Sequence, residues 1–201
     1  MSNHDDTEVD AERRRLLMMA GGVVGVAATA SVVVPFVASM SPSERAKAAG
    51  APVEVDISKL KPGQLMTVEW RGKPVWILVR TPEMLEQLHT HDEKLVDPHS
   101  EHSTQPHYCR NTTRSLKPGM MVALGVCTHL GCTPTPQFKT GEESGVDPEW
   151  PGGFFCPCHG STFDLAGRVF KDKLAPRNLE IPPHRILADG RLVIGEDAVK
   201  A

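Results

Sequence analysis

Two short segments, CTHLGC (Cys127–Cys132) and CPCHGS (Cys156–Ser161), decide how this chain folds. Each segment offers two thiols and one imidazole, and 23 residues separate the two segments. Four of the five cysteines therefore lie close together in the sequence, which is typical of a metal site or a redox pair. Gly131 and Gly160 permit tight backbone turns, and Pro157 stiffens the second segment. We therefore expect both segments to fold over one small inorganic group.

The spacing within each segment indicates the candidate ligands. The pattern is Cys-x-His in the first segment and Cys-x-x-His in the second, so we expect thiolates from Cys127 and Cys156 and imidazoles from His129 and His159. Two other interpretations of the same residues compete. Zinc is commonly held by two cysteines and two histidines, but zinc leaves the other two cysteines unexplained. A framework of disulfides alone leaves both histidines without a role.

The two segments together resemble the Rieske motif of the cytochrome bc family, the quinol–cytochrome c oxidoreductases. The resemblance continues through KLAPRNLEIP (Lys173–Pro182), which is similar to the proline loop of that family, and extends back to the N-terminus. It covers essentially the whole chain. The resemblance implies one 2Fe-2S cluster of the Rieske type, with Cys127 and Cys156 on one iron and His129 and His159 on the other.

The same resemblance implies roles for residues around the ligands. Cys132 and Cys158 would form a disulfide that braces the two loops, and Ser161, next to Gly160 at the cofactor, would donate a hydrogen bond to a cluster sulfur. Phe163 departs from the family pattern, because many members carry Tyr at the matching place and its hydroxyl bonds a ligand cysteine sulfur. Phe has no such donor. This difference bears on the reduction potential and not on the presence of the cluster.

Histidine ligands have a physical consequence for such a cluster. Four thiolates give an oxidised 2Fe-2S site a net negative charge, whereas two thiolates and two neutral imidazoles leave it neutral. An electron is added more easily to a neutral site than to a dianion, so the potential rises. Each imidazole also keeps a second nitrogen that can donate a hydrogen bond or release a proton.

By this resemblance, the chain is expected to be a one-electron carrier of the respiratory chain. It would oxidise ubiquinol at the quinol-oxidation site of a cytochrome bc complex and pass the electron to cytochrome c1, with release of protons. His159 would bind the quinol beside His129, and Leu130, next to the cofactor, would contact cytochrome b together with Pro176. The complex is a dimer in this family.

Three other functions compete with this one. The small Rieske subunit of arsenite oxidase is also exported by the twin-arginine route, but the Gly-Ser that follows His159 and the proline loop favour the bc family. A Rieske ferredoxin that feeds an oxygenase does not account for the two additional cysteines or for the N-terminal apolar segment. A zinc-stabilised binding module is the alternative without redox chemistry.

The N-terminal region predicts a membrane anchor. Residues 1–15 read as a polar cytoplasmic stub, expected to be disordered, that ends in three arginines. No charged residue occurs from Leu16 to Ser43, and about 20 apolar residues are enough to cross a bilayer as a helix. We expect this helix over residues 16–40. The arginines place its N-terminal end in the cytoplasm and fit a twin-arginine signal, here uncleaved, since no convincing cleavage site follows.

The remaining residues are expected to form a flexible tether and a periplasmic head. Residues 41–52 are small and polar and suit a tether. Residues 53–201 form the head, with a cluster-binding part at about 127–176. A disulfide fits this assignment because disulfides persist in the periplasm and are rare in the cytosol. The anchor would lie in the inner membrane of a bacterium and contact lipid.

The head is expected to be mostly antiparallel β. Three segments read as strands, separated by the turn signals KPG and RGK: VEVDI (53–57), QLMTVEW (64–70) and PVWILVR (74–80). MMVALGV (120–126) reads as a short buried strand that leads into Cys127. Thr81 and Pro82 predict a helix start. The segment HRILADGRLVIG predicts a hairpin that turns at Asp189 and Gly190.

The remaining sequence features give little information about function. The formal charge of −3 and pI of about 6.3 give no basic surface for nucleic acid. Cys109 is expected to be a small packed thiol. Four acidic side chains of one loop are expected to be solvated: Glu142, Glu143, Asp147 and Glu149. The alternative is that they attract a positively charged partner. Histidines ahead of the first segment are expected to be solvated rather than to bind a second metal: His89, His91, His99, His102 and His107.

Overall fold

The computed structural model describes residues 5–43 and 50–198. The chain divides into an N-terminal unit (Met1–Lys47) and a head (Ala48–Ala201). Of the predicted tether, residues 41–43 and 50–52 are described, and residues 44–49 lie outside the described residues.

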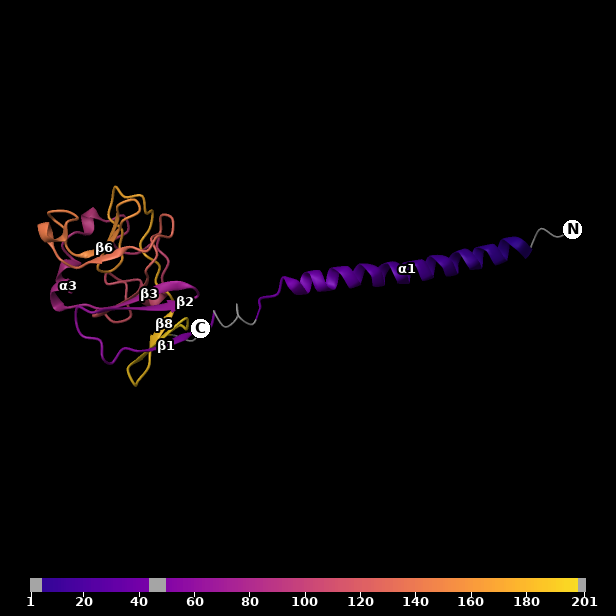
Figure 1. Ribbon diagram of the computed structural model, residues 1–201, viewed down its shortest axis with the longest axis horizontal. Helices are drawn as coiled ribbons and strands as arrows, with labels where there is room; N and C mark the ends of the chain where they lie inside the picture. The colour runs from indigo at the N-terminus through magenta and orange to yellow at the C-terminus, as the bar shows by residue number, and fades with distance from the viewer. Residues whose placement is uncertain (1–4, 44–49, 199–201) are drawn as a thin grey trace. The chain divides into compact units, whose positions relative to one another are not determined.

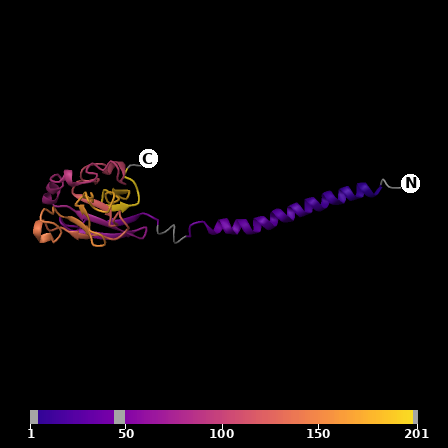
Figure 2. The ribbon, with the colours of Figure 1, turned by 90° about the horizontal axis from the view of Figure 1, so that it is seen from above.

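The described part of the N-terminal unit is dominated by one helix, α1 (Asp5–Ser39), which runs without a break in both views of the ribbon (Figures 1 and 2). Its segment from Ala11 to Ser39 is long and apolar enough to cross a membrane, and its side chains are not buried against other parts of the protein. Helix α1 ends at Ser39, one residue before the expected end at residue 40.

The beginning of this helix differs from the expectation. We expected residues 1–15 to be a disordered stub, but α1 already begins at Asp5. Residues 1–4 lie outside the described residues. Residues with high helix propensity, Ala, Glu and Arg, follow from Ala11 to Arg15 and extend the helix toward the N-terminus. The helix was predicted from its apolar run alone, and an apolar run does not indicate how far a helix continues into polar residues.

Three antiparallel sheets of three strands each form the described part of the head. Their strand orders are β1-β9-β8, β2-β3-β4 and β5-β6-β7. The strands have these bounds: β1 (Val53–Asp56), β2 (Leu65–Trp70), β3 (Lys73–Val79), β4 (Met120–Leu124), β5 (Thr135–Gln137), β6 (Gly153–Cys156), β7 (Ser161–Asp164), β8 (His184–Ile186) and β9 (Arg191–Ile194). The helices are α3 (Pro82–Gln87) and three single 3₁₀ turns, Asp92–Lys94, His107–Cys109 and Gly141–Ser144.

The sheet of β2, β3 and β4 lies between the other two sheets (Figure 1). Successive side chains of a strand point to opposite faces, and β3 shows this directly. Trp76 and Leu78 pack into one core, toward β6 and β7. Val75 and Ile77 pack into a second core, toward β9. A strand that is buried on both faces reads as a continuous apolar run, which explains the sequence PVWILV.

The predicted elements of this framework are confirmed. The strands expected at 53–57, 64–70, 74–80 and 120–126 correspond to β1, β2, β3 and β4. Thr81 caps α3 by accepting a hydrogen bond from the backbone N–H of Met84. The C-terminal hairpin pairs His184 with Ile194 and turns where predicted.

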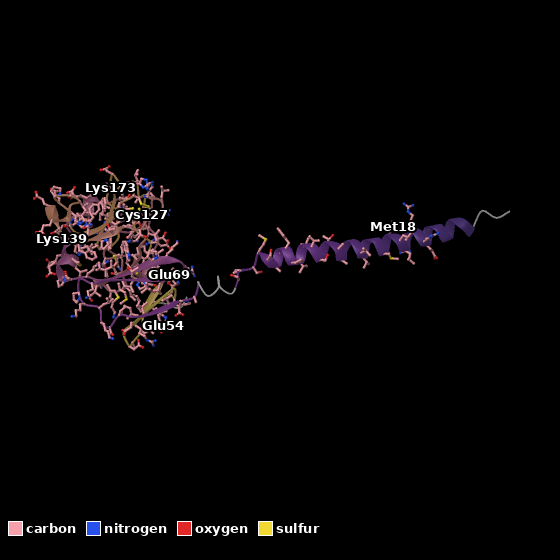
Figure 3. The ribbon with its side chains drawn as sticks, viewed as in Figure 1. Met18, Glu54, Glu69, Cys127, Lys139 and Lys173 are labelled. Carbon is pink, nitrogen blue, oxygen red and sulfur yellow. A yellow bond between two sulfur atoms is a disulfide. The ribbon has the colours of Figure 1, made fainter. Side chains whose placement is uncertain are left out.

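The sheet of β5, β6 and β7 was not predicted. It is inserted between β4 and β8, and its strands have three or four residues. The ring of Trp76 on β3 stacks on Phe154 of β6, with centroids 4.5 Å apart. This contact joins the inserted sheet to the central one. Cys127 lies in the half of the head away from Glu54 on β1 (Figure 3).

Candidate metal centre

Two closed loops carry the predicted ligands. The first follows β4, where the backbone N–H of Gly131 donates to the carbonyl of Cys127 at 3.0 Å, and Cys127 donates in turn to the carbonyl of Cys132 at 2.7 Å. The second joins β6 to β7, where Gly160 donates to the carbonyl of Cys156 at 2.9 Å. Both glycines adopt positive φ, as the sequence predicted for tight turns. Each loop is thus a fixed backbone turn that begins at a cysteine.

The thiols lie inside this centre and the imidazoles lie outside. Cys127 and Cys156 are each 2% exposed, whereas His159 is exposed and His129 is half-buried. The two imidazole rings lie 4.7 Å apart between centroids and are nearly perpendicular, at 85°. Four donors from two loops therefore converge, with the pair of rings on the water side.

Burial and local hydrogen bonds act on Cys127 in opposite directions. Burial, together with the neighbouring Cys156, raises the pKa of its thiol, and hydrogen bonds from the backbone N–H of His129 and from the hydroxyl of Ser161 offset only part of that rise. The same two donors stabilise a thiolate, the form of cysteine that binds a metal. This set of donors fits a metal centre with two thiolates and two imidazoles.

A disulfide joins the two loops. Cys132 and Cys158 form the predicted bond, with Cα atoms 6.7 Å apart. The sulfur atoms of Cys132, Cys156 and Cys158 all lie within 4.8 Å of one another. This group of three is not the ligand set, because the disulfide uses two of its sulfur atoms. It shows instead that the brace lies directly beside a candidate ligand.

The segment 173–182 closes over both loops. The backbone N–H of Ala175 donates to the hydroxyl of Ser161 at 3.1 Å, and the hydroxyl of Thr128 donates to the carbonyl of Arg177 at 2.6 Å. Each ligand loop is therefore tied to this third segment by a hydrogen bond.

Apolar side chains are exposed on the first ligand loop and on the segment 173–182. Leu130 is 72% exposed and Leu174 is 58% exposed, and Pro176 is exposed as well. Large apolar residues in water next to a functional group are typical of an interaction surface. Leu174 was not singled out in the sequence.

Comparisons with known proteins agree with this geometry. A family model described as "Rieske [2Fe-2S] domain" matches residues 52–183, and another described as "Ubiquitinol-cytochrome C reductase Fe-S subunit TAT signal" matches residues 3–43. The ubiquinol-cytochrome c reductase iron-sulfur subunit of Allochromatium vinosum is 58% identical, over 94% of this chain and 91% of that protein. The chain belongs to the Rieske iron–sulfur subunits of ubiquinol–cytochrome c reductase.

Further relatives extend the comparison. The protein of the same name from Blastochloris viridis is 39% identical, over 97% of this chain and 98% of that protein. A solved structure titled "Hyperthermophilic respiratory Complex III" is similar at 26% identity, with a TM-score of 0.43, over 87% of this chain and 98% of that chain. As a Rieske subunit, the chain binds a Rieske-type 2Fe-2S cluster, and the twin-arginine segment with α1 fits a membrane-anchored subunit of the bc complex.

Phe163 lies beneath the cluster loops of this Rieske subunit. It belongs to β7, is fully buried, and packs in the same core as Cys127 and Cys156. Its strand pairs it with Phe154. A phenylalanine side chain in this position contributes packing but no hydrogen bond, and its effect on the reduction potential stays a prediction.

Three buried arginines hold the segment that follows the second loop. Arg80 donates from Nε to the carbonyl of Leu165 at 2.9 Å. Arg114 donates from Nη1 to the carbonyls of Ala166 at 3.1 Å and Gly167 at 3.3 Å. Arg168 donates from Nε to Asp164 at 2.7 Å. Burial lowers the pKa of Arg80 to about 9 and that of Arg114 to about 10, so both remain cationic at neutral pH.

Asp164 balances this positive charge. It is fully buried and accepts hydrogen bonds from the backbone N–H groups of Ala166 and Arg168, both at 2.8 Å. Burial alone raises its pKa, but the contact with His91 and the charge of Arg168 outweigh burial and lower the pKa to about 2. No sequence motif indicates this network, because its members lie up to 88 residues apart, from Arg80 to Arg168.

The weaker sequence signals have mixed outcomes. The prediction that His91 is solvated was wrong: it is 5% exposed, lies 3.3 Å from Asp164 and stacks on Phe170. The other four histidines of that group are exposed, as expected. Cys109 is fully buried, and burial raises the pKa of its thiol to about 12, so it is the packed thiol that was predicted.

Proposed function

We propose that this Rieske subunit takes electrons one at a time from ubiquinol and delivers them to cytochrome c1 in a cytochrome bc complex. The observation that carries the proposal is the arrangement of the four donors. Two thiols are buried, and two imidazoles with ring centroids 4.7 Å apart lie on the water side of them, on loops that also carry the exposed apolar side chain of Leu130. Such an arrangement excludes water from the thiolate side of a bound metal group and leaves the imidazole side accessible to a partner.

The proposed ligands are Cys127 and Cys156 for one iron and His129 and His159 for the other. When bound, the 2Fe-2S cluster supplies reversible one-electron chemistry. Ser161 supports the site, because its hydroxyl bonds the sulfur of Cys127 and accepts from the backbone of Ala175. Gly160 gives the second loop the turn that brings His159 back over the centre.

His159 is proposed to bind the quinol. One nitrogen of its exposed ring would hold iron, which leaves the other nitrogen to exchange a hydrogen bond and a proton with the quinol hydroxyl. His129 is less exposed, so it is placed to fix the first loop and to hold a second proton. Proton release from the quinol would thus pass through a ring nitrogen at the surface of the head.

Leu130 and Pro176 are proposed to contact cytochrome b. Both belong to loops that are tied to each other through Thr128 and Arg177. Exposed apolar area that is removed from water on docking favours binding by about 25 cal/mol per Å². A transient contact of this kind suits a carrier that must also leave its partner.

The remaining assignments concern location and assembly. Helix α1 is proposed to cross the bacterial inner membrane with its N-terminus in the cytoplasm, because Arg13 to Arg15 precede the apolar segment. The head would then lie in the periplasm, where the Cys132–Cys158 disulfide is stable. Residues 41–52 would act as a tether that lets the head move between cytochrome b and cytochrome c1. The complete complex is proposed to be dimeric.

An EPR spectrum of the reduced full-length protein tests the ligand set. Mixed thiolate and imidazole ligation predicts a 2Fe-2S signal with a low average g value, and a zinc module predicts no signal. Cys127→Ser and His159→Ala should abolish the Rieske signal, whereas Cys109→Ser, which removes a buried thiol elsewhere, should retain it. Membranes that carry each variant should then be assayed for ubiquinol–cytochrome c turnover. A normal Rieske spectrum without such turnover would leave the cluster in place and refute the proposed electron path.

A further inference from the structure

Three sulfur atoms form one compact group at the side of the metal centre. Cys132 and Cys158 are joined by the disulfide, Cys156 is a buried thiol, and the three sulfur atoms all lie within 4.8 Å of one another. Thiols attack disulfides as thiolates, through contact with one of the two sulfur atoms. The proposed iron ligand Cys156 is therefore also within reach of the bond that joins the two loops.

We propose that Cys156 exchanges with the Cys132–Cys158 disulfide whenever Cys156 is not bound to iron, so that iron ligation maintains the native pairing. This inference rests on the proposed assignment of Cys156 as a ligand. In the exchange, the Cys156 thiolate forms a bond to the sulfur of Cys132. The Cys132–Cys158 bond breaks, and Cys158 leaves as a thiolate that takes up the proton given up by Cys156. One disulfide is lost and one is gained, so no oxidant or reductant is required.

The burial of the three cysteines favours one of the two possible products. Cys158 is exposed, whereas Cys132 is half-buried. Attack on Cys132 releases the thiolate of Cys158 into water, where it is solvated. The product Cys132–Cys156 also continues to join the two loops. Attack on Cys158 would instead release a half-buried thiolate and would close a small ring across Pro157 within one loop.

The other free cysteines are placed differently. Cys109 is fully buried, and burial raises the pKa of its thiol to about 12, so little thiolate forms. Cys127 lies beside Cys156 but is not a member of the group of three sulfur atoms. Cys156 itself is 2% exposed, so thiols from solution reach it poorly while the internal disulfide lies next to it.

The exchange has a consequence for cofactor loading. A chain with the Cys132–Cys156 bond has lost one of its four proposed ligands and cannot hold the cluster. Loss of the cluster in an oxidising compartment would thus become irreversible until a thiol reductant restores the native pairing. The cluster must accordingly be bound before or while the disulfide forms.

Disulfide mapping of the full-length protein tests this proposal without an activity assay. The cluster is removed from the purified protein with mild acid and a chelator under argon, and the protein is held for some hours at mildly alkaline pH. Free thiols are then blocked with N-ethylmaleimide under denaturing conditions, and peptides are mapped without reduction by mass spectrometry. We expect Cys132–Cys158 in the loaded protein, and Cys132–Cys156 with alkylated Cys158 in the cluster-free protein. Added iron and sulfide should restore the EPR signal only after treatment with dithiothreitol.

Three variants complete the test. Cys156→Ser should retain Cys132–Cys158 without a cluster, and Cys109→Ser should behave as the parent protein. Cys127→Ser loses the cluster through loss of a ligand rather than through chelation, and it should give the same exchanged pairing. Retention of Cys132–Cys158 with a free Cys156 in the cluster-free parent would overturn the proposal. An EPR signal that survives Cys156→Ser would instead refute the ligand assignment, so the two failures are distinguishable.

Discussion

Replacement of Asp164 by Asn tests whether the buried charge network holds the second cluster loop in place. Asp164 directly follows Phe163 on β7 and accepts hydrogen bonds from Arg168, whose side chain is fully buried. The amide of Asn retains an oxygen acceptor but removes the negative charge. Arg168 then keeps one carboxylate partner, Asp92 at 2.7 Å, which is partly exposed. We expect a folded head with a loosened support beneath the cluster loops.

The size of the effect follows from two estimates. The pKa of Asp164 is lowered from 3.8 to about 2, and a difference of that size corresponds to roughly 2 kcal/mol of stability. Removal of one member of a buried ion pair typically costs about 3–5 kcal/mol. We therefore expect a loss of about 3 kcal/mol. In a head of about 150 residues this lowers the thermal midpoint by roughly 10 °C.

The pH dependence gives a second signature. A carboxyl group with a lowered folded pKa stabilises the protein above its unfolded pKa, and this contribution is lost as the pH falls toward the folded pKa. The parent protein should thus lose the contribution of Asp164 between pH 3.8 and about 2. The difference between the parent and Asp164→Asn should be largest at neutral pH and should shrink across that window.

Thermal melting of the cluster-loaded protein, followed by visible circular dichroism of the cluster, provides the measurement. Asp172→Asn makes the same chemical change at an exposed position and should melt within about 2 °C of the parent, as surface substitutions usually do. A midpoint for Asp164→Asn within that same range, or a difference from the parent that does not change with pH, would refute the reasoning.

Three further changes test the centre and its delivery. Phe163→Tyr adds a hydrogen-bond donor beneath the cluster thiolates and should raise the midpoint potential by about 40 mV, the equivalent of about 1 kcal/mol for one electron. Redox titration with EPR detection measures this shift, and Phe155→Tyr serves as the control. An unchanged potential in Phe163→Tyr would contradict the expectation. Gly153→Ala places a Cβ only 2.0 Å from the carbonyl oxygen of Phe163, so the yield of cluster-loaded protein should fall sharply, whereas Gly119→Ala, with nothing within 4 Å, should not change it. Prolines introduced into residues 41–52 should slow ubiquinol–cytochrome c turnover and leave the EPR spectrum unchanged; full turnover with a stiff tether would contradict a moving head.

The framework of the head could be predicted from the sequence because its strands are long and regularly patterned. β2 and β3 have six and seven residues, enough for alternation or a continuous apolar run to be recognised. The strands that carry the cluster loops could not be predicted. β6 (GFFC) and β7 (STFD) have four residues each and show no alternation of apolar and polar residues. They form strands because β6 pairs with both β5 and β7.

The motif predicts a set of four ligands, but it carries no information about the residues that support them. Cys127, His129, Cys156 and His159 carry their chemistry in their residue types and local spacing. The burial of His91 depends on Asp164, which is 73 residues away in the chain. No local pattern can report a contact over such a separation, so a histidine in a polar segment reads as solvated until the fold is known.

The arginine network distributes mutational tolerance unevenly along the chain. Arg80 donates to the main-chain carbonyl oxygens of Thr113 and Pro118, and a carbonyl is chemically the same whatever side chain its residue bears. Side chains at the acceptor positions can therefore drift over evolution without loss of the bond. The donor cannot, because lysine offers a single ammonium where a planar fork reaches several carbonyls at once. A saturation mutagenesis map of this head should show isolated intolerant arginines that face permissive stretches of backbone.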